Sequence, residues 1–394
     1  MGDTLANNTD LSKGERRYYL DNLKVFLIFL VILHHAGQPY GPTGGFWQYQ
    51  SSLHENIPWL GSFFSVNAAF FMGLFFLISG YFLTGSYDRK GGNEFLKDKI
   101  IRYGIPMLFM FIVLQPLQMY FYYILYSGNT LIDFVSYYKN IYFGIGGKPN
   151  GFIESIGWPE MNFGHLWFVE HLLVYSLVYW LIRRIFLIDK TQHSFGNYGY
   201  RQIIILALFI ALGSDLIRNW YPIDSWVGIL GFIQAEIAHL PQYLTLFITG
   251  IIACRKSWFD SITKKTGYCV LKIGLLMALI IYLRLIIPDS VRMIIYENWA
   301  IYESFMAIFI CWGLIIFFRE RINTTSPCLQ FLAENSYAAY IFHLPIVLAV
   351  QYSLDKVDIL GPIGKFLIVS LLSIIITYGV SYGIRNLPHV RRVI

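Results

Sequence analysis

The sequence has little charge and little cysteine, and it lacks the common signatures of nucleotide and zinc binding. Charged residues make up 14% of the 394 residues, against about 25% in a typical soluble domain. This deficit excludes a disordered chain and a conventional nucleic-acid-binding protein. The four cysteines form no CxxC pair and no His/Cys cluster at zinc spacing, so neither a disulfide framework nor a metal site is predicted. Walker A and GxGxxG loops are also missing from the sequence.

Apolar and aromatic residues dominate instead. Hydrophobic residues account for 56% of the chain and aromatic residues for 18%, and the mean hydropathy is +0.51. A membrane-spanning helix needs about 20 apolar residues, and the sequence offers ten runs of suitable composition. The chain is therefore predicted to be an all-α polytopic membrane protein, a bundle of about ten transmembrane helices. The runs cover residues 22–37, 62–84, 101–126, 165–187, 202–218, 240–254, 268–288, 298–318, 335–353 and 362–384.

The distribution of basic residues predicts the topology of these spans. About 22 of the 30 Lys and Arg residues fall into the segments that share a side with the N-terminus, as the positive-inside rule requires if both termini are cytoplasmic. We see no cleavable signal peptide. The expected organisation is a cytoplasmic segment at 1–19, a transmembrane domain at 20–386 and a cytoplasmic tail at 387–394. The predicted location is the cell (inner or plasma) membrane, with lipids as partners.

The first predicted span carries two ionisable residues, which are costly in a membrane and therefore candidates for function. Lys24 and His35 are eleven positions apart, so they lie within about 20° of one face of a helix and about 16 Å apart along its axis. The imidazole of His35 would suit a general base, because its charge changes near neutral pH. The alternative is that His35 only caps the helix and Lys24 only orients the span.

A basic pair stands at the start of the third span. Lys99 and Arg102 are separated by three positions, which predicts one shared helix face at the cytoplasmic boundary. Two neighbouring cations could hold a phosphate group, with Arg89 close by in the sequence. Anchoring to anionic lipid is the alternative for all three.

Polar residues also interrupt the outer ends of later spans. Glu170 and Glu303 are expected one to two turns inside the fourth and eighth spans. Asp215 and Arg218, three positions apart, could pair with each other. Trp167 has the alternative role of an interface anchor.

The ninth span contains one polar stripe. Ser336, Tyr340 and His343 follow the i, i+4, i+7 spacing of a helix face. The alternative to a functional role is a satisfied hydrogen-bond network that only stabilises helix contacts.

Together these residues resemble the acyltransferase 3 family of multi-spanning O-acyltransferases. The resemblance runs from about Tyr18 to Arg392, and the segments around 17–21 and 102–108 look most like the glucans biosynthesis protein C group, in which Arg is more frequent at the position of Lys24. The matching motifs are Lys24 with His35, Ser79-Gly80-Tyr81-Phe82, Lys99 with Arg102, Gly164-His165-Leu166-Trp167-Phe168, and Ser336 to His343.

The resemblance implies an enzyme that transfers an acetyl or succinyl group from cytoplasmic acyl-CoA to a hydroxyl of a carbohydrate or glycan. His35 would act as general base or as acyl carrier, and the sequence leaves both routes open. We expect Glu303 or Glu170 to orient His35. The predicted ligands of the CoA phosphates and donor arm are Lys24, Arg89, Lys99 and Arg102. The predicted acceptor site comprises His165, Trp167, Arg218, Tyr340 and His343.

Two other functions fit a bundle with buried polar groups. One is a transporter or exporter of a polysaccharide or lipid-linked sugar, although the sequence shows no internal repeat with matching broken helices. The other is an assembly partner in which His35 is structural. Binding of acyl-CoA would distinguish the enzyme from both. No nucleic-acid partner is expected, and a homo-oligomer is left open.

Overall fold

A computed structural model provides the structure. It describes residues 16–42, 47–53, 55–126, 131–145, 163–186, 198–230, 233–284, 286–357 and 361–394. Lys13 and Lys190, two residues of the predicted basic side, and most of the predicted segment 1–19 lie outside these residues.

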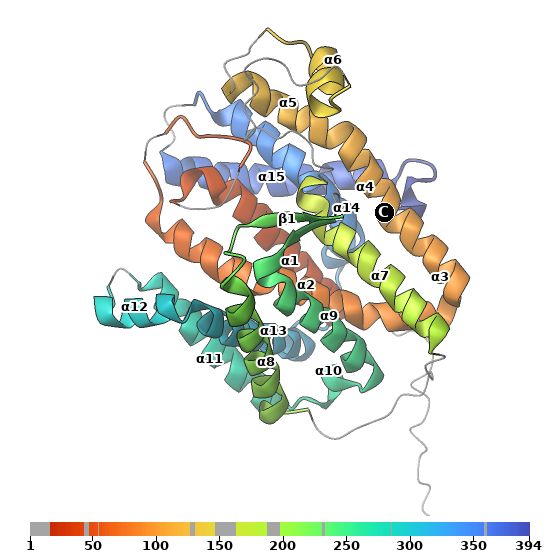
Figure 1. Ribbon diagram of the computed structural model, residues 1–394, viewed down its shortest axis with the longest axis vertical. Helices are drawn as coiled ribbons and strands as arrows, with labels where there is room; N and C mark the ends of the chain where they lie inside the picture. The colour runs from red at the N-terminus through yellow and green to blue at the C-terminus, as the bar shows by residue number, and fades with distance from the viewer. Residues whose placement is uncertain are drawn as a thin grey trace, which may run out of the picture.

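The prediction of an all-α protein with ten spans is confirmed. Ten helical stretches in the described part of the chain are long and apolar enough to cross a membrane, and they form the bundle in Figure 1. The third span is one rod made of α3, α4 and α5, joined by π-helical turns at Ile100–Gly104 and Met110–Leu114. The spanning helices are α1 (Tyr18–Gly37), α2 (Pro58–Lys90), α3 (Gly92–Lys99), α4 (Ile105–Phe109), α5 (Gln115–Tyr126), α7 (Trp167–Ile185), α8 (Tyr200–Arg218), α9 (Leu240–Arg255), α11 (Lys264–Tyr282), α13 (Trp299–Arg321), α14 (Pro327–Leu354) and α15 (Pro362–Arg385).

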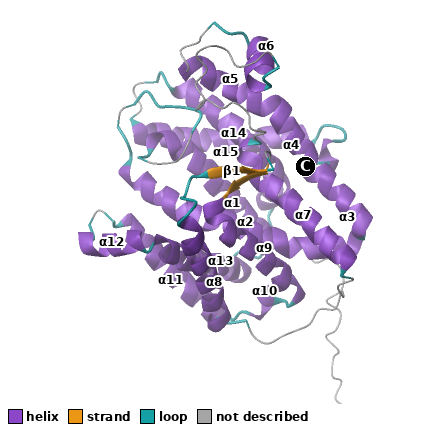
Figure 2. Ribbon diagram, viewed as in Figure 1, coloured by secondary structure: helices purple, strands orange, loops and turns teal. Residues whose placement is uncertain are grey.

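The remaining elements are short and lie between the spans. An antiparallel hairpin joins α8 to α9, and its two strands are drawn in orange in Figure 2. The helix α12 projects from the bundle in Figure 1. The bounds are α6 (Phe134–Ser136), β1 (Trp226–Ile229), β2 (Ile233–Glu236), α10 (Trp258–Ser261) and α12 (Asp289–Glu297).

Ion pairs hold together the end of the bundle at which α1 begins, which we call the basic face. Arg17 forms a two-pronged contact with Asp260, at 2.7 and 2.9 Å. Glu334 lies within 4.0 Å of Arg16 and 3.3 Å of Arg385. The start of α1 and the end of α15 therefore meet at the same face. We name the other end of the bundle the opposite face.

Three prolines inside spans leave backbone carbonyls without a helical hydrogen-bond donor, and side chains from other segments donate to these carbonyls. Proline has no N–H, so the carbonyl four residues before it loses its helical partner. In each case an aromatic or imidazole side chain donates to that carbonyl and ties two segments together. Tyr337 donates to Arg102 before Pro106 (2.6 Å), Tyr138 donates to Ile112 before Pro116 (3.0 Å), and His165 donates to Ile341 before Pro345 (2.9 Å).

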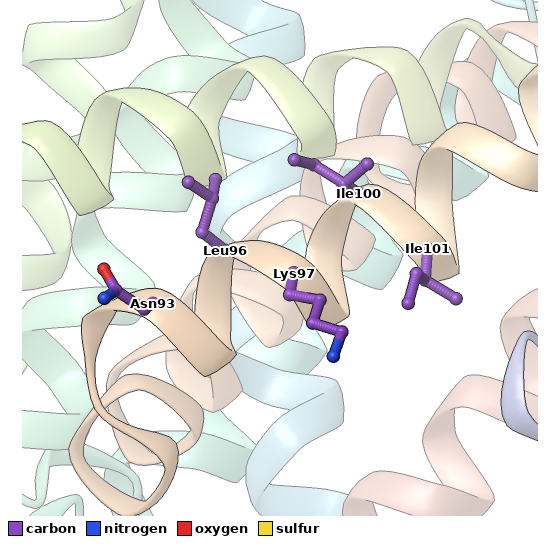
Figure 3. Close-up of a pocket in the computed structure, with 5 residues that line it drawn as sticks. All are labelled: Asn93, Leu96, Lys97, Ile100 and Ile101. Carbon is purple, nitrogen blue, oxygen red and sulfur yellow. The ribbon is translucent and has the colours of Figure 1, made fainter.

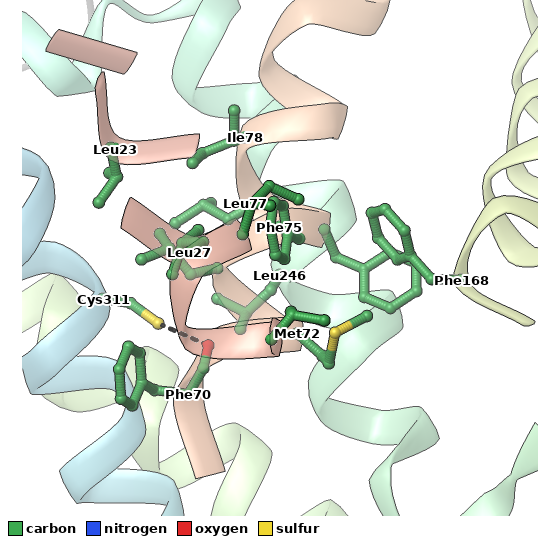
Figure 4. Packing of buried hydrophobic residues seen from close by; sticks show 14 of the residues in the cluster. Leu23, Leu27, Phe70, Met72, Phe75, Leu77, Ile78, Phe168, Leu246 and Cys311 are labelled. Atoms are coloured by element: carbon green, nitrogen blue, oxygen red, sulfur yellow. Dashed lines mark hydrogen bonds between the residues drawn. The ribbon is translucent and has the colours of Figure 1, made fainter. Parts of the chain in front are cut away.

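The centre of the bundle is packed with aliphatic and aromatic side chains from α1, α2, α9 and α13. Figure 4 shows Leu23 and Leu27 of α1 among side chains of α2, with the thiol of Cys311 directed at the carbonyl of Phe70 at 3.7 Å. Small residues allow the closest approach, between α2 and α9. A methyl group on Gly80 would collide with the carbonyl oxygen of Phe247, and one on Gly250 would collide with that of Leu77.

We expect Gly80→Ala to destabilise the protein, because backbone atoms at this contact cannot move aside as a side chain can. Overpacking typically costs about 1–3 kcal/mol, and helices in lipid depend on close packing of small residues. Thermal unfolding in detergent should show a clearly lower midpoint. Gly379→Ala is the matched control, because no atom lies within 4 Å of the added methyl group. Equal midpoints for the two variants would contradict the packing argument.

Candidate active site

His35 lies in the last turn of α1 and is held through one ring nitrogen. Its Nδ1 is 2.6 Å from Oε1 of Gln38, in the 3₁₀ turn that follows the helix. The amide oxygen can only accept, so Nδ1 carries the proton and Nε2 keeps a lone pair. Nε2 has no hydrogen-bond partner among the described residues, and the His35 side chain is half-buried. The basic nitrogen of His35 is therefore left without a donor.

Two rings stack nearly parallel to His35. Trp47 lies 4.9 Å away between ring centroids at 11°, and His343 lies 5.3 Å away at 23°. Gln351 links the assembly: its Oε1 accepts from Nε1 of Trp47 at 2.9 Å, and its Nε2 donates to the carbonyl of His35 at 3.2 Å. Trp47 and Gln351 were not predicted as site residues, because a loop residue and a glutamine inside a span carry no helical signal.

The loop that carries Trp47 is attached to the end of α14. The carboxylate of Asp355 accepts from the hydroxyl of Tyr49 and from the backbone N–H of Ser52. Burial alone would raise the pKa of Asp355, but these hydrogen bonds outweigh burial and hold the pKa below its usual value. Contacts outside the membrane spans thus hold the loop that carries the stacking partner of His35.

Three imidazoles come together at this point. His343 of α14 is fully buried and donates from Nδ1 to the carbonyl of Tyr340 at 2.7 Å. His165, just before α7, lies 4.8 Å from His343 between ring centroids, and the hydroxyl of Tyr340 donates to the carbonyl of His165 at 2.6 Å. Nε2 of His343 and Nδ1 of His165 are buried without partners. The cluster therefore offers three basic nitrogens that lack a donor.

The structure thus brings together four of the predicted site residues, His35, His165, Tyr340 and His343, from three segments far apart in sequence. Their contacts agree with a shared site, and their chemical roles stay predictions.

The interpretation that Glu303 orients His35 is wrong. The carboxylate of Glu303 lies 2.6 Å from Arg218 and 3.2 Å from His239. The expected pairing of Asp215 with Arg218 is also incorrect, because Glu303 takes its place. The three-residue spacing within α8 permitted the local pair, but the packing of α8 against α13 supplies a closer carboxylate.

The interpretation that Glu170 orients His35 is wrong as well. Oε2 of Glu170 accepts the backbone N–H of Gln234 in β2 at 3.2 Å, while Oε1 is buried without a partner. The neighbouring His171 donates to the carbonyl of Gln234 at 2.8 Å. Both side chains therefore hold the hairpin, and Gln38 is the described residue that orients His35.

An ionic chain that sequence reasoning missed continues from β2. Glu236 lies 2.8 Å from Nδ1 of His239, whose other nitrogen contacts Glu303. Burial alone would raise the pKa of Glu236, but the hydrogen bond and charge of His239 outweigh it and hold the pKa below its usual value. Glu236 also accepts the backbone N–H of Asp224 at 2.8 Å. The predicted acceptor residue Arg218 belongs to this chain rather than to the histidine cluster.

At the basic face, Lys99 and Arg102 lie at the two ends of an aromatic pair. Lys99 is 8% exposed and lies 3.4 Å from the hydroxyl of Tyr103. The guanidinium of Arg102 lies 5.4 Å from the ring centroid of Tyr337, and the two tyrosine rings are 6.4 Å apart. Neither cation has a carboxylate partner among the described residues.

The prediction that Lys99 and Arg102 share one face is wrong in its geometry. It assumed an α-helix, whereas Ile100–Gly104 is a π-helical turn with hydrogen bonds over five residues. Lys99 lies just before this turn and is buried, whereas Arg102 lies within it and is exposed.

The other two predicted donor residues differ in their surroundings. Lys24 is paired with Asp21 at 2.8 Å and lies over the ring of Phe82, whereas Arg89 is exposed at the end of α2.

A groove of about 320 Å³ runs along α3 and the first residues of the π-helical turn that follows it, and Figure 3 shows its lining. The groove is mostly apolar, with Lys97 as its charged member. Its lining residues are Asn93, Leu96, Lys97, Ile100 and Ile101.

A membrane-embedded bundle with a histidine cluster and unpaired cations at one end defines the class of the protein. The family model of the acyltransferase domain matches residues 17–382, so the chain belongs to the acyltransferase 3 family. It is similar to the glucans biosynthesis protein C of Escherichia coli strain K12, with 25% identity over 342 residues that cover 85% of this chain and 83% of that protein. The protein of the same name from E. coli O139:H28 is 25% identical over 345 residues. No solved structure matches the chain. The protein is therefore a multi-pass membrane acyltransferase.

Proposed function

We propose that the protein transfers an acyl group of the acetyl or succinyl class from acyl-CoA to a hydroxyl of a carbohydrate, with His35 as the reacting residue. The observation that carries this proposal is the state of the His35 ring. Nδ1 is fixed by Gln38, and Nε2 has no hydrogen-bond partner among the described residues. A general base needs this combination of a fixed tautomer and a free nitrogen.

In the direct route, Nε2 of His35 removes the proton of the acceptor hydroxyl as its oxygen attacks the thioester carbonyl. The tetrahedral intermediate then collapses, the C–S bond breaks, and the imidazolium returns the proton to the leaving thiolate. In the covalent route, Nε2 itself attacks the thioester carbonyl and the C–S bond breaks, which releases CoA as the thiolate and leaves an acyl-imidazolium, because Nδ1 keeps its proton. The acceptor hydroxyl then attacks the acyl group, Nε2 leaves as the neutral imidazole, and the hydroxyl proton passes to the thiolate. His343, which stacks on His35, and His165, which contacts His343, help to position the reacting groups in both routes.

The donor would enter at the basic face. Lys99 and Arg102, with Arg89 nearby, supply cations for the phosphates of CoA. Arg102 lies over Tyr337 of α14, and His343 of the same helix stacks on His35. Six residues separate Tyr337 from His343, or about 9 Å of helical rise, a distance that an extended pantetheine arm can cover. We propose that this face is cytoplasmic, in agreement with the positive-inside rule, and that the protein resides in the cell membrane.

The acceptor class rests on the family and on its relatives, whose name assigns them to glucan biosynthesis. A glucan is therefore the first acceptor to examine. The proposal needs no metal ion.

Thermal unfolding of the purified protein with acyl-CoA tests the donor. A ligand present at 100 times its Kd stabilises the folded state by about 2.7 kcal/mol, so acetyl-CoA or succinyl-CoA should raise the unfolding midpoint by a few degrees. Pantothenate, which lacks the phosphates and the adenosine, is the control ligand and should cause no shift. Stabilisation by an oligosaccharide without any response to acyl-CoA would contradict the enzyme and favour a sugar transporter.

A further inference from the structure

The β1–β2 hairpin is too small to be stable by itself, and buried polar side chains hold it in place. Two short strands in isolation are marginal in water. Here Glu170 and His171 of α7 bind both backbone groups of Gln234, as described above. Glu236 at the end of β2 joins the chain of His239 and Glu303. Burying so many charged groups is costly, which indicates that the exact position of this hairpin matters.

The hairpin presents one large aromatic side chain against Trp167, at the start of α7. Trp226 of β1 is 45% exposed and makes an edge-to-face contact with Trp167, at 5.4 Å between ring centroids. Trp167 is two residues after His165, so their Cα atoms are at most about 7 Å apart. Trp226 is therefore anchored at one edge, partly exposed, and connected through Trp167 to the segment that carries His165.

The chemistry around Trp226 suits a neutral sugar ring. A fixed, partly exposed indole offers a flat apolar surface for the CH groups of a pyranose. Nδ1 of His165 and Oε1 of Glu170 also lack partners, but both atoms are buried. The exposed part of the Trp226 indole is therefore the surface that a ligand can contact.

We propose that Trp226, held in place by the Glu170 and His171 contacts with the hairpin, is the platform that binds a neutral pyranose unit of the glycan acceptor. This inference rests on the proposed acyl transfer to a carbohydrate and names the residue that recognises the acceptor. Trp226 acts on acceptor affinity and has no part in donor binding.

The experiment compares Trp226→Ala and Trp226→Tyr with Trp220→Ala. Trp220 is the matched control because it follows α8, at the same end of that helix as the hairpin with Trp226. It is 67% exposed and makes no ring contact among the described residues. The probe is a linear β-linked glucose hexasaccharide, measured by calorimetric binding and, with succinyl-CoA or acetyl-CoA, by the KM and kcat of transfer. The midpoint shift with acyl-CoA reports donor binding separately.

We expect Trp226→Ala to raise both the Kd and the KM for the hexasaccharide about 10-fold, with kcat at saturating acceptor and the acyl-CoA midpoint shift unchanged. Trp226→Tyr should lie between that variant and the wild type, and Trp220→Ala should match the wild type. An unchanged hexasaccharide Kd in Trp226→Ala, or no hexasaccharide binding by the wild type, would overturn the inference. Equal effects of Trp226→Ala and Trp220→Ala would do so too, since both would then be membrane-interface anchors. If acyl-CoA caused no midpoint shift in the wild type, the proposed acyl transfer would be overturned. Weaker hexasaccharide binding by Trp226→Ala would then still support the role of Trp226 in sugar binding.

Discussion

Replacing His35 with alanine is expected to lower the rate of acyl transfer by at least about 100-fold, since a positioned general base contributes roughly 10²–10⁴-fold. The variant removes Nε2 of His35 but leaves the stacked Trp47 and His343 attached to their own partners. Donor binding at the basic face should persist, so the midpoint shift with acyl-CoA should remain. Transfer to the glucose oligosaccharide is the measurement.

His34→Gln is the matched control for this prediction. His34 is the neighbouring imidazole on α1, but its Nδ1 contacts Asn67 at 3.2 Å and its ring stacks on Phe71. It should retain most of the activity. A His35→Ala protein that folds and transfers acyl groups at the wild-type rate would refute the mechanism. Mass spectrometry of the wild type with acyl-CoA and no acceptor separates the two routes, because only the covalent route adds the acyl mass to His35.

The double variant Lys99→Ala/Arg102→Ala should weaken acyl-CoA binding by about 100-fold or more. A hydrogen bond to a charged group contributes roughly 1.5–3 kcal/mol, and each 1.4 kcal/mol corresponds to about 10-fold in Kd. Neither cation has a carboxylate partner among the described residues, so both are available for phosphate. The measurement is the Kd for acyl-CoA, with kcat at saturating donor expected to change little.

Lys264→Ala is the matched control for the donor site. Lys264 is exposed at the basic face and lies 5.9 Å from the ring centroid of Tyr268, an arrangement like that of Arg102 over Tyr337. It should leave the Kd unchanged. If the double variant bound acyl-CoA normally but lost a dependence on anionic lipid, Lys99 and Arg102 would be lipid anchors and the donor site would lie elsewhere.

Local composition and periodicity were sufficient to predict the spans and several site residues. Each span can be recognised from its own apolar run. In α1 and α14 the side chains follow the α-helical period over most of the helix. The positions of His35 and of the stripe with Tyr340 and His343 could therefore be predicted. The period failed at Lys99 and Arg102, because a π-helical turn beside Pro106 changes the register.

The partners of these residues could not be predicted in the same way. By residue type alone, Gln38, Glu303 and Glu170 are all plausible hydrogen-bond partners of His35. Distance decides, and the distance depends on how α1, α7 and α13 pack. Trp47 and Trp226 belong to a loop and to a hairpin, where no helical period marks a residue as functional.

The prolines illustrate this division best. Pro345 by itself determines that the carbonyl of Ile341 lacks a helical partner, because the missing N–H is a covalent property of the residue. Only the tertiary structure decides that His165 donates a hydrogen bond to this carbonyl, because His165 lies 176 positions away in the sequence. The sequence thus determined the spans, their helix faces and the free backbone acceptors, which depend on neighbouring residues. Helix packing decided which side chains meet at His35, because contacts between distant segments depend on the shapes of all the helices that pack together.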